Sequence, residues 1–256
     1  MVEKVVEIAR TAGEVIREGF GKNFQVDFKT NETNLVTEID KKAEEVIISY
    51  IQKEFPAHAI LAEESGAKLN DSEYLWVIDP IDGTTNFAHG LPIFSVSIGV
   101  QKNGETICGI VYDVMMDRMY QAEKGGGAFL GDLKLKVSDG DNLKQSLLVT
   151  GFPYDIRENP RNIKELFSDF MMNSRGIRRL GSAAIDFCYI ASGVFDGYWE
   201  YSLNPWDMAA GILLVQEAGG KVTNFTDETV NIYSKQILAS NGKIHWQMME
   251  IIKRNE

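Results

Sequence analysis

An apolar run that ends directly in carboxylates is the feature that most constrains what this chain can fold into. Residues 75–78 carry no polar side chain, which is typical of a strand buried on both faces of its sheet. Asp79 therefore emerges at the end of a core strand, and Pro80 is expected to end that strand because it has no N–H group to donate. A tight turn through Asp82 can then aim both carboxylates at one point.

The residues that follow this strand suit a metal ion and an anion. Gly83 permits an unusual backbone conformation and close approach of a ligand. Thr84 and Thr85 can cap a short helix and hold an anion through hydroxyl and N–H groups. Carboxylates next to an anion site need cations between them, and oxygen ligands without His or Cys match a hard cation such as Mg²⁺.

An ordinary turn is the alternative, because Asp, Pro, Gly and Thr are common in turns. Three further acidic positions favour the functional interpretation. Glu63 and Glu64 directly follow the apolar run 59–62, Asp207 lies in the first turn of a predicted helix, and Asp40 lies near the start of another. Together with the turn, they predict a carboxylate-rich metal site.

Composition excludes several other classes of protein. A chain of 256 residues, 44% of them hydrophobic, can build its own core without disulfides or a structural metal. Its net charge of −11 argues against binding nucleic acid or a membrane surface. Cys108 and Cys188 have no zinc-ligand spacing and read as buried free thiols of a cytoplasmic protein. No P-loop or dinucleotide-binding glycine pattern occurs, and we see no signal peptide or membrane-spanning run.

The N-terminal half is predicted to be two helices followed by a strand-rich sheet. Apolar residues recur at three- and four-residue steps over 2–19 and 38–55, and Thr37 with Asp40 resembles a capping box ahead of the second helix. Asn103-Gly104 indicates a hairpin. The expected strands are 24–30, 59–62, 75–78, 94–101, 105–112, 119–122 and 128–130, with a polar loop over 29–34.

The C-terminal half changes to alternating strands and helices, as in an α/β unit. The change falls near 136–145. We therefore predict an N-terminal α+β subdomain (1–138) with the metal motif and a C-terminal α/β subdomain (139–256) that completes the active site. The expected strands are 146–150, 177–180, 195–201, 222–225 and 237–239, and the expected helices are 160–172, 182–191, 205–218 and 244–254.

Several sequence blocks resemble the inositol monophosphatase family. The string Asp-Pro-Ile-Asp-Gly-Thr-Thr-Asn-Phe at 79–87 is similar to one family signature, and Trp-Asp-Met-Ala-Ala-Gly at 206–211 is similar to the second. The remaining matching blocks are 35–40, 63–65, 181–184 and 217–220. This resemblance implies a layered αβαβα sandwich, a homodimer, and Mg²⁺-dependent, Li⁺-sensitive hydrolysis of small phosphate monoesters.

The resemblance also implies which residues would hold two to three Mg²⁺ ions. Glu63, Asp79 and the Ile81 carbonyl would bind one ion, and Asp79, Asp82 and Asp207 a second. A third, more weakly bound ion would be held by Glu63 and water. For this reason Glu63 is also predicted to be a catalytic residue.

Roles in catalysis follow from the same resemblance. Thr84, paired with Asp40, would orient and activate the attacking water. Gly83 and Thr84, with Thr85 as a further candidate, would bind the phosphate. Lys29 would lie on a mobile loop over the site.

The substrate is expected to be a small phosphorylated polyol or sugar. Glu200 matches the family position that accepts inositol hydroxyls, and Asp82, Ser182 and Ala183 should line the same pocket. The leading prediction is hydrolysis of inositol 1-phosphate. The alternatives are a sister phosphatase acting on fructose 1,6-bisphosphate, 3′-phosphoadenosine 5′-phosphate or histidinol phosphate, and a non-catalytic metal-binding scaffold.

Overall fold

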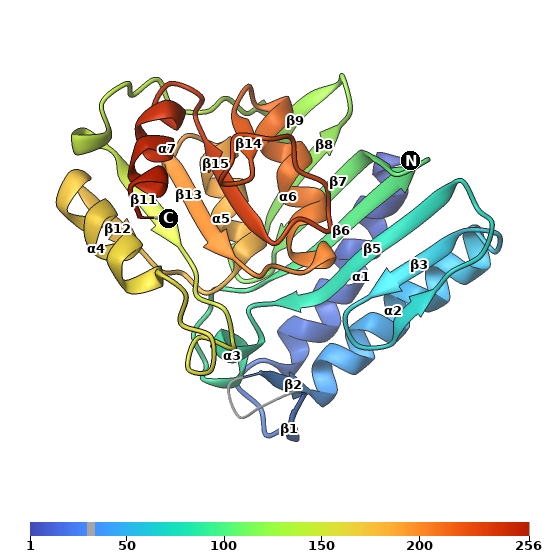
Figure 1. The fold of residues 1–256 in the computed structure, drawn as a ribbon. Helices are drawn as coiled ribbons and strands as arrows, with labels where there is room; N and C mark the ends of the chain where they lie inside the picture. Colours follow the sequence, from blue (N-terminus) through green and yellow to red (C-terminus); the bar gives the residue numbers. More distant parts are fainter. Residues whose placement is uncertain (30–33, 256) are drawn as a thin grey trace.

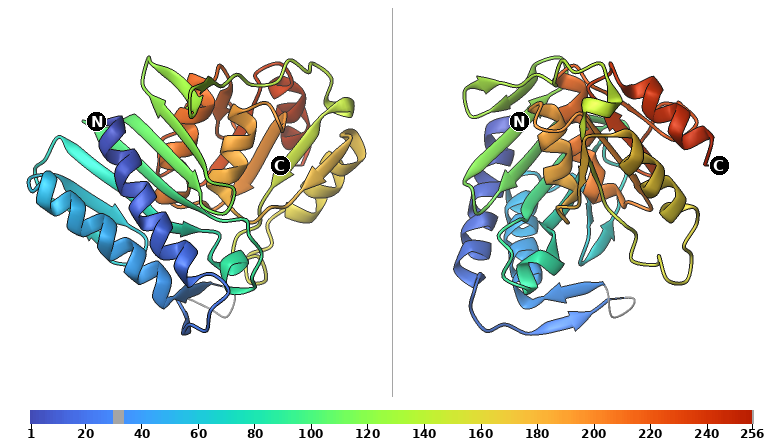
Figure 2. Two further views of the ribbon diagram at one scale, coloured as in Figure 1. Left: turned by 180° about the vertical axis from the view of Figure 1, so that it is seen from behind. Right: turned by 90° about the vertical axis from the view of Figure 1, so that its left-hand side faces the viewer.

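The computed structural model describes residues 1–29 and 34–255 and arranges them in alternating layers of helices and sheets (Figure 1). Helices α1 and α2 cover the outer face of a larger sheet, where they lie side by side (Figure 2). Helices α5 and α6 lie between this sheet and a smaller one, whose other face packs against α4 and α7. The predicted layered mixture of helices and sheets is confirmed. The helices are α1 (Val2–Gly19), α2 (Glu38–Glu54), α3 (Thr84–Ala88), the 3-10 turn η1 (Leu143–Gln145), α4 (Ile163–Asn173), α5 (Ala183–Ala191), α6 (Pro205–Glu217) and α7 (His245–Lys253).

The larger sheet has the strand order β10-β9-β8-β7-β6-β5-β3-β4, and only the β3–β5 pair is parallel among the described residues. The predicted hairpin at Asn103-Gly104 is confirmed: both residues have positive φ, at 52° and 81°, as a two-residue turn between paired strands requires. The short strands β4 and β10 were not predicted. The strands are β3 (Ala59–Ala62), β4 (Gly66–Lys68), β5 (Tyr74–Asp82), β6 (Ser95–Lys102), β7 (Glu105–Asp113), β8 (Arg118–Glu123), β9 (Gly127–Leu130) and β10 (Leu133–Lys134).

Strand β5 corrects one prediction, because Pro80 does not end it. The strand continues to Asp82, but its pairing with β6 shifts register: Asp79 lies opposite Ser97 and Asp82 opposite Ser95. Three steps on β5 therefore match two steps on β6. This extra residue is a β-bulge, which accommodates a proline that cannot donate a ladder hydrogen bond.

The smaller sheet has the order β12-β11-β13-β15-β14, with β11 parallel to β12 and β13 and the remaining pairs antiparallel. The alternation predicted for this half is present. The helix expected from residue 160 begins only at Ile163, since Arg161 has a φ of 50° that no right-handed helix accepts. The strands are β11 (Leu147–Thr150), β12 (Gly176–Arg178), β13 (Gly197–Tyr201), β14 (Lys221–Thr223) and β15 (Gln236–Ser240).

Close packing of α6 joins the two sheets. A Cβ atom on Gly99 would lie 2.6 Å from the Ala209 side chain, and one on Gly109 only 2.8 Å from the Ala210 carbonyl oxygen. The helix therefore approaches strands β6 and β7 closely only because both positions are glycine. Helix α6 also contacts β14 and β15 of the smaller sheet. The N-terminal end of α6 is therefore held in place by contacts with both sheets. The division into subdomains at 138/139 stays a prediction.

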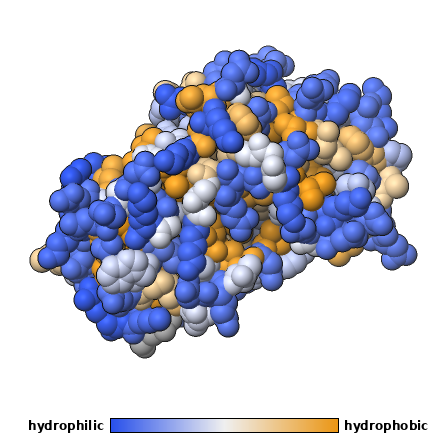
Figure 3. All heavy atoms as spheres, turned by 90° about the horizontal axis from the view of Figure 1, so that it is seen from above, coloured by the Kyte–Doolittle hydropathy of each residue, from blue (hydrophilic) through white to orange (hydrophobic). Residues whose placement is uncertain are grey.

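A separate hairpin of β1 (Val26–Phe28) and β2 (Leu35–Thr37) lies beside the N-terminal end of α2. The strand expected over 24–30 is thus shorter, and most of the predicted loop over 29–34 lies outside the described residues. Among the residues described, no helix is both long and apolar enough to cross a membrane. Figure 3 shows a face covered largely by hydrophilic residues, in keeping with the charged composition.

Candidate active site

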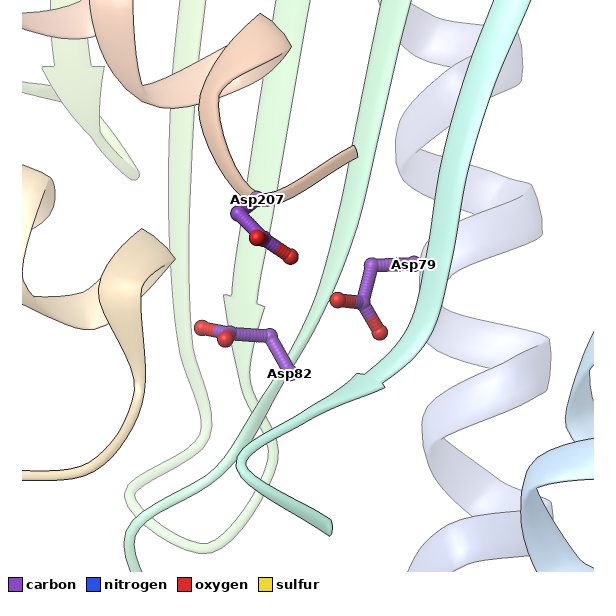
Figure 4. Close-up of side chains that lie close together, drawn as sticks. All are labelled: Asp79, Asp82 and Asp207. Carbon is purple, nitrogen blue, oxygen red and sulfur yellow. The ribbon is translucent and has the colours of Figure 1, made fainter. Parts of the chain in front are cut away.

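Three aspartates from two distant parts of the chain converge where β5 meets α6 (Figure 4). Asp79 and Asp82 flank the bulge of β5, and Asp207 lies in the first turn of α6. Residues three apart on a regular strand face opposite sides, so the extra residue is what brings Asp79 and Asp82 to the same side. One carboxylate oxygen of each lies within 4.8 Å of the others.

The electrostatics of this cluster call for a cation. Burial raises the pKa of Asp79 well above its usual value, and the charges of Glu63, Asp82 and Asp207 raise it further. Burial likewise raises the pKa of Asp207, and that of Asp82 to about 6. Asp79 Oδ1 is buried and has no hydrogen-bond partner among the described residues. Repelling carboxylates with an unused oxygen fit a hard divalent cation such as Mg²⁺.

Asp82 is held by the N-terminus of α5. The Ser182 hydroxyl donates to Asp82 Oδ2 at 2.5 Å, and the backbone N–H groups of Ala183 and Ala184 donate at 3.2 and 2.8 Å. The positive end of the helix macrodipole stabilises a carboxylate at this place. Ser182 and Ala183 also line the pocket, and their bonds to Asp82 hold that carboxylate in place.

Asp207 is oriented by a capping box. Its Oδ2 atom accepts the Asn204 backbone N–H at 2.7 Å, and its own N–H donates to the Asn204 carbonyl at 3.2 Å. Pro205 occupies the first helical position, where a missing N–H costs nothing. These contacts leave the other carboxylate oxygen for the cluster.

Asp40 and Thr84 form a buried pair beside the aspartates. Thr84 Oγ1 lies 2.9 Å from Asp40 Oδ1 and 3.0 Å from the Ile81 carbonyl oxygen. The predicted capping box of α2 is confirmed, since the Thr37 N–H donates to Asp40 Oδ2 at 2.9 Å and the Asp40 N–H donates to Thr37 Oγ1 at 3.4 Å. Burial raises the pKa of Asp40, although hydrogen bonds from Thr37 and Thr84 oppose this. A hydroxyl between two acceptors has one proton to give.

Glu63 lies next to the three-aspartate cluster, where it contacts Asp79 and raises the pKa of that carboxyl, and it also contacts Lys29. The Lys29 ammonium lies 2.8 Å from Glu63 Oε1 and 2.5 Å from Glu64 Oε1. Although burial lowers the pKa of Lys29, the two glutamates more than compensate and raise it. Glu64 has its pKa raised to about 7 by burial and by Glu63, despite the contact with Lys29. Both Glu63 and the aspartates still line one pocket.

Glu44 is a functional candidate that the sequence interpretation missed. It is 2% exposed, and its two carboxylate oxygens accept the backbone N–H groups of Glu64 and Ser65, each at 2.8 Å. This bidentate contact fixes the turn that presents Glu63. Asp40 lies four residues earlier on the same helix, so the i, i+4 spacing of two acids was the signal available.

The far side of the pocket contains Glu200. It lies within β13 and is 8% exposed, and its Oε2 accepts the Tyr198 hydroxyl at 2.6 Å. Burial raises the pKa of Glu200 to about 7, which the Tyr198 hydrogen bond and the charge of Arg179 oppose. Of the predicted phosphate-binding residues, Gly83 and Thr84 line the pocket, whereas Thr85 lies beside it, half-buried. Pocket-lining residues that the sequence interpretation missed include Gly151, Phe152, Pro153, Tyr154, Arg179 and Asp186.

Comparison with known proteins identifies the family. The sequence model of the inositol monophosphatase family matches residues 1–255. The chain belongs to the inositol monophosphatase family. It is 43% identical to the phosphatase IMPL1 of Arabidopsis thaliana chloroplasts, over 97% of this chain and 69% of that protein. It is 38% identical to a fructose-1,6-bisphosphatase/inositol-1-monophosphatase of Aquifex aeolicus, over 99% and 97%.

Solved structures agree. The inositol monophosphatase of Anabaena superposes with a TM-score of 0.89 at 42% identity, covering 99% of this chain and 95% of that one. As a member of this family, the chain is a phosphoric monoester hydrolase. The family is metal-dependent, and the cluster of Asp79, Asp82 and Asp207 could hold the metal.

Replacing Glu44 tests its support of Glu63. In Glu44→Gln an amide NH₂ faces one of the two N–H groups, so one hydrogen bond is lost and the turn loosens. We expect the Mg²⁺ concentration for half-maximal phosphate release to rise about 10–100-fold, as for other residues that orient ligands. Glu45→Gln, at the neighbouring exposed position, is the control. An unchanged Mg²⁺ requirement in Glu44→Gln would show that the turn needs no such support.

Removing one charge from the cluster tests the repulsion. Asp79→Asn should raise the free energy of unfolding of the metal-free protein by about 1–2 kcal/mol, because a buried, unpaired carboxylate is lost. Thermal unfolding in EDTA measures this. Adding Mg²⁺ should then raise the midpoint of the wild type but hardly that of the variant. A metal-free variant less stable than the wild type would contradict this account.

Proposed function

We propose that the protein hydrolyses inositol 1-phosphate to inositol and phosphate, with Mg²⁺ as cofactor and water as nucleophile. The observation that carries this proposal is the convergence in one pocket of the three-aspartate cluster, the Thr84–Asp40 pair and Glu200. The first two suit attack on a phosphate ester. Glu200 suits the hydroxyls of a polyol.

Two to three Mg²⁺ ions would occupy the carboxylate end of the pocket. Glu63, Asp79 and the Ile81 carbonyl would hold one, and Asp79, Asp82 and Asp207 a second, with a weaker third at Glu63. When bound, such ions supply the charge that an in-line displacement at phosphorus needs on its attacking and leaving oxygens. Lys29 would have to leave Glu63 for this, which agrees with its proposed place on a mobile loop.

Thr84 and Asp40 would remove a proton from the attacking water. If Thr84 donates its hydroxyl proton to Asp40 Oδ1, at 2.9 Å, its lone pairs face away from that bond and can accept a proton from water. Burial strengthens Asp40 as a base. The pair thus orients the nucleophile and gives its proton a destination.

The phosphate would lie over the turn that begins α3. Gly83 has a φ of 103°, and a Cβ there would lie 3.0 Å from the Ile93 carbonyl oxygen, so only glycine fits. The first N–H groups of a helix have no partner within it, which leaves those of Gly83, Thr84 and Thr85 for the phosphate oxygens. Ser182, Ala183 and Glu200 would then contact the polyol.

A sister activity on fructose 1,6-bisphosphate is the second candidate, since the Aquifex relative is named as both a fructose-1,6-bisphosphatase and an inositol-1-monophosphatase. We also expect a cytoplasmic homodimer that Li⁺ inhibits and that binds neither nucleic acid nor membranes. These expectations follow from the family resemblance and the net charge of −11.

Phosphate release from a substrate panel tests the proposal. We expect the highest kcat/KM for inositol 1-phosphate, and its loss when EDTA removes Mg²⁺. The comparison substrates are fructose 1,6-bisphosphate, 3′-phosphoadenosine 5′-phosphate and histidinol phosphate. A higher kcat/KM for one of these would identify that ester as the substrate instead. No Mg²⁺-dependent release from any of them would favour an ester outside this panel or a non-catalytic scaffold.

Thr84 variants test the proton path. Thr84→Ala removes the hydroxyl, so kcat should fall at least 100-fold, the usual contribution of general acid–base catalysis, while KM changes little. Thr84→Ser keeps the hydroxyl and should retain activity within about tenfold of wild type. Equal losses in both variants would assign Thr84 to packing instead.

A further inference from the structure

Asp186 is a buried acid that lines the pocket but has no part in the proposed metal site, proton path or phosphate site. It lies in the first turn of α5, is 1% exposed and lines the pocket together with Glu200. Its Oδ1 atom has no hydrogen-bond partner within the part of the chain that the structure describes. Buried carboxylates that only support a fold normally have their oxygens satisfied.

Other buried acids of the same chain show this contrast. Asp82 accepts hydrogen bonds from Ser182, Ala183 and Ala184. Asp113, which is 2% exposed and outside the pocket, accepts the Met116 N–H at 3.2 Å. Asp186, like Asp79 of the metal cluster, keeps an oxygen unused while it borders the pocket, so it has capacity for a ligand.

The surroundings of Asp186 indicate what that ligand is. Burial raises its pKa, and the charges of Glu200 and Asp82 raise it further, while Arg179 opposes them. Among the charged neighbours of Asp186, Glu200 therefore has the largest effect on its pKa. The two acids together disfavour a second anionic group, and they offer several oxygens that can accept from, or when protonated donate to, neutral hydroxyls.

A glycine keeps this end of the pocket open for Glu200. A Cβ atom on Gly151 would lie only 2.2 Å from both Glu200 carboxylate oxygens. Tyr198 fixes the same carboxylate from β13 through its hydroxyl. Glu200 is thus held in one position by its neighbours, whereas Asp186 is fixed through its helix and keeps its Oδ1 unpaired.

We propose that Asp186 is a substrate-specificity residue that binds, together with Glu200, two hydroxyl groups on the polyol part of the substrate. This inference rests on the proposed phosphatase function and deepens it. It specifies a neutral polyhydroxylated leaving group, with hydroxyls near the ester, in preference to a leaving group with a second phosphate. Hydroxyl recognition of this kind is selective, because a substrate without the hydroxyl leaves buried acids unpaired.

Kinetics on two monoesters test this inference. Inositol 1-phosphate carries the hydroxyls, and phenyl phosphate presents the same phosphate without them. Asp186→Ala should lower kcat/KM for inositol 1-phosphate about 10–100-fold, the loss of a hydrogen bond to an acid in a buried site, and leave that for phenyl phosphate within about twofold. Inhibition by free inositol should weaken by a similar factor. Asp113→Ala is the matched control and should leave the ratio of the two kcat/KM values unchanged.

Equal losses on both esters, or no loss on either, would overturn the inference. If Asp186→Ala does not fold, Asp186→Asn decides the question: it keeps the shape but loses the charge, and we expect a several-fold fall for inositol 1-phosphate only. An unchanged ratio in that variant overturns the inference as well. The proposed function fails separately, if the wild type releases phosphate from neither ester with Mg²⁺.

Discussion

Mutual repulsion among buried carboxylates is the constraint on which the rest of this structure depends. Asp79, Asp82 and Asp207 would separate in a flexible chain, since each carboxylate disfavours ionisation of the others. The fold keeps them together with contacts that are individually ordinary: a bulge in β5, the N-terminus of α5 and the capping box of α6. Because Gly99 and Gly109 let α6 pack tightly against the larger sheet, Asp207 cannot retreat without disturbing the core. The site therefore stores unfavourable energy that a bound cation would release.

Helix α2 has a second organising role, although it lines no wall of the pocket. Two of its buried acids, one helical turn apart, reach different parts of the site. Asp40 contacts Thr84 at the start of α3, and Glu44 holds the turn that carries Glu63. Asp40 is the proposed proton acceptor, and Glu44 positions the proposed metal ligand Glu63. The distance between these two parts of the site is thus set by one turn of a rigid helix.

Sequence patterns predicted the parts of this arrangement that are local. The hairpin at Asn103-Gly104 and the capping box of Thr37 and Asp40 depend on residues that are neighbours along the chain. The behaviour of Pro80 was mispredicted, because a proline signals a strand end unless the partner strand absorbs an extra residue, and the partner's register is not local. Glu44 and Asp186 were missed for the same reason. What distinguishes them is a contact, or the lack of one, with residues that the fold brings together.

The carboxylates of the pocket fall into two groups, which differ in how closely their oxygens lie together. At one end three aspartates place oxygens within 4.8 Å of one another, which suits a cation. Asp186 and Glu200 line the same pocket but do not belong to that cluster. There Tyr198 donates to Glu200, and Arg179 offsets part of the charge, so the need for a cation is weaker. An anionic phosphate would be drawn to the metal end and excluded from the acidic pair, which gives the substrate one orientation. The proposed arrangement would let a protein with a net charge of −11 bind a phosphate ester and still discriminate against a second phosphate on it.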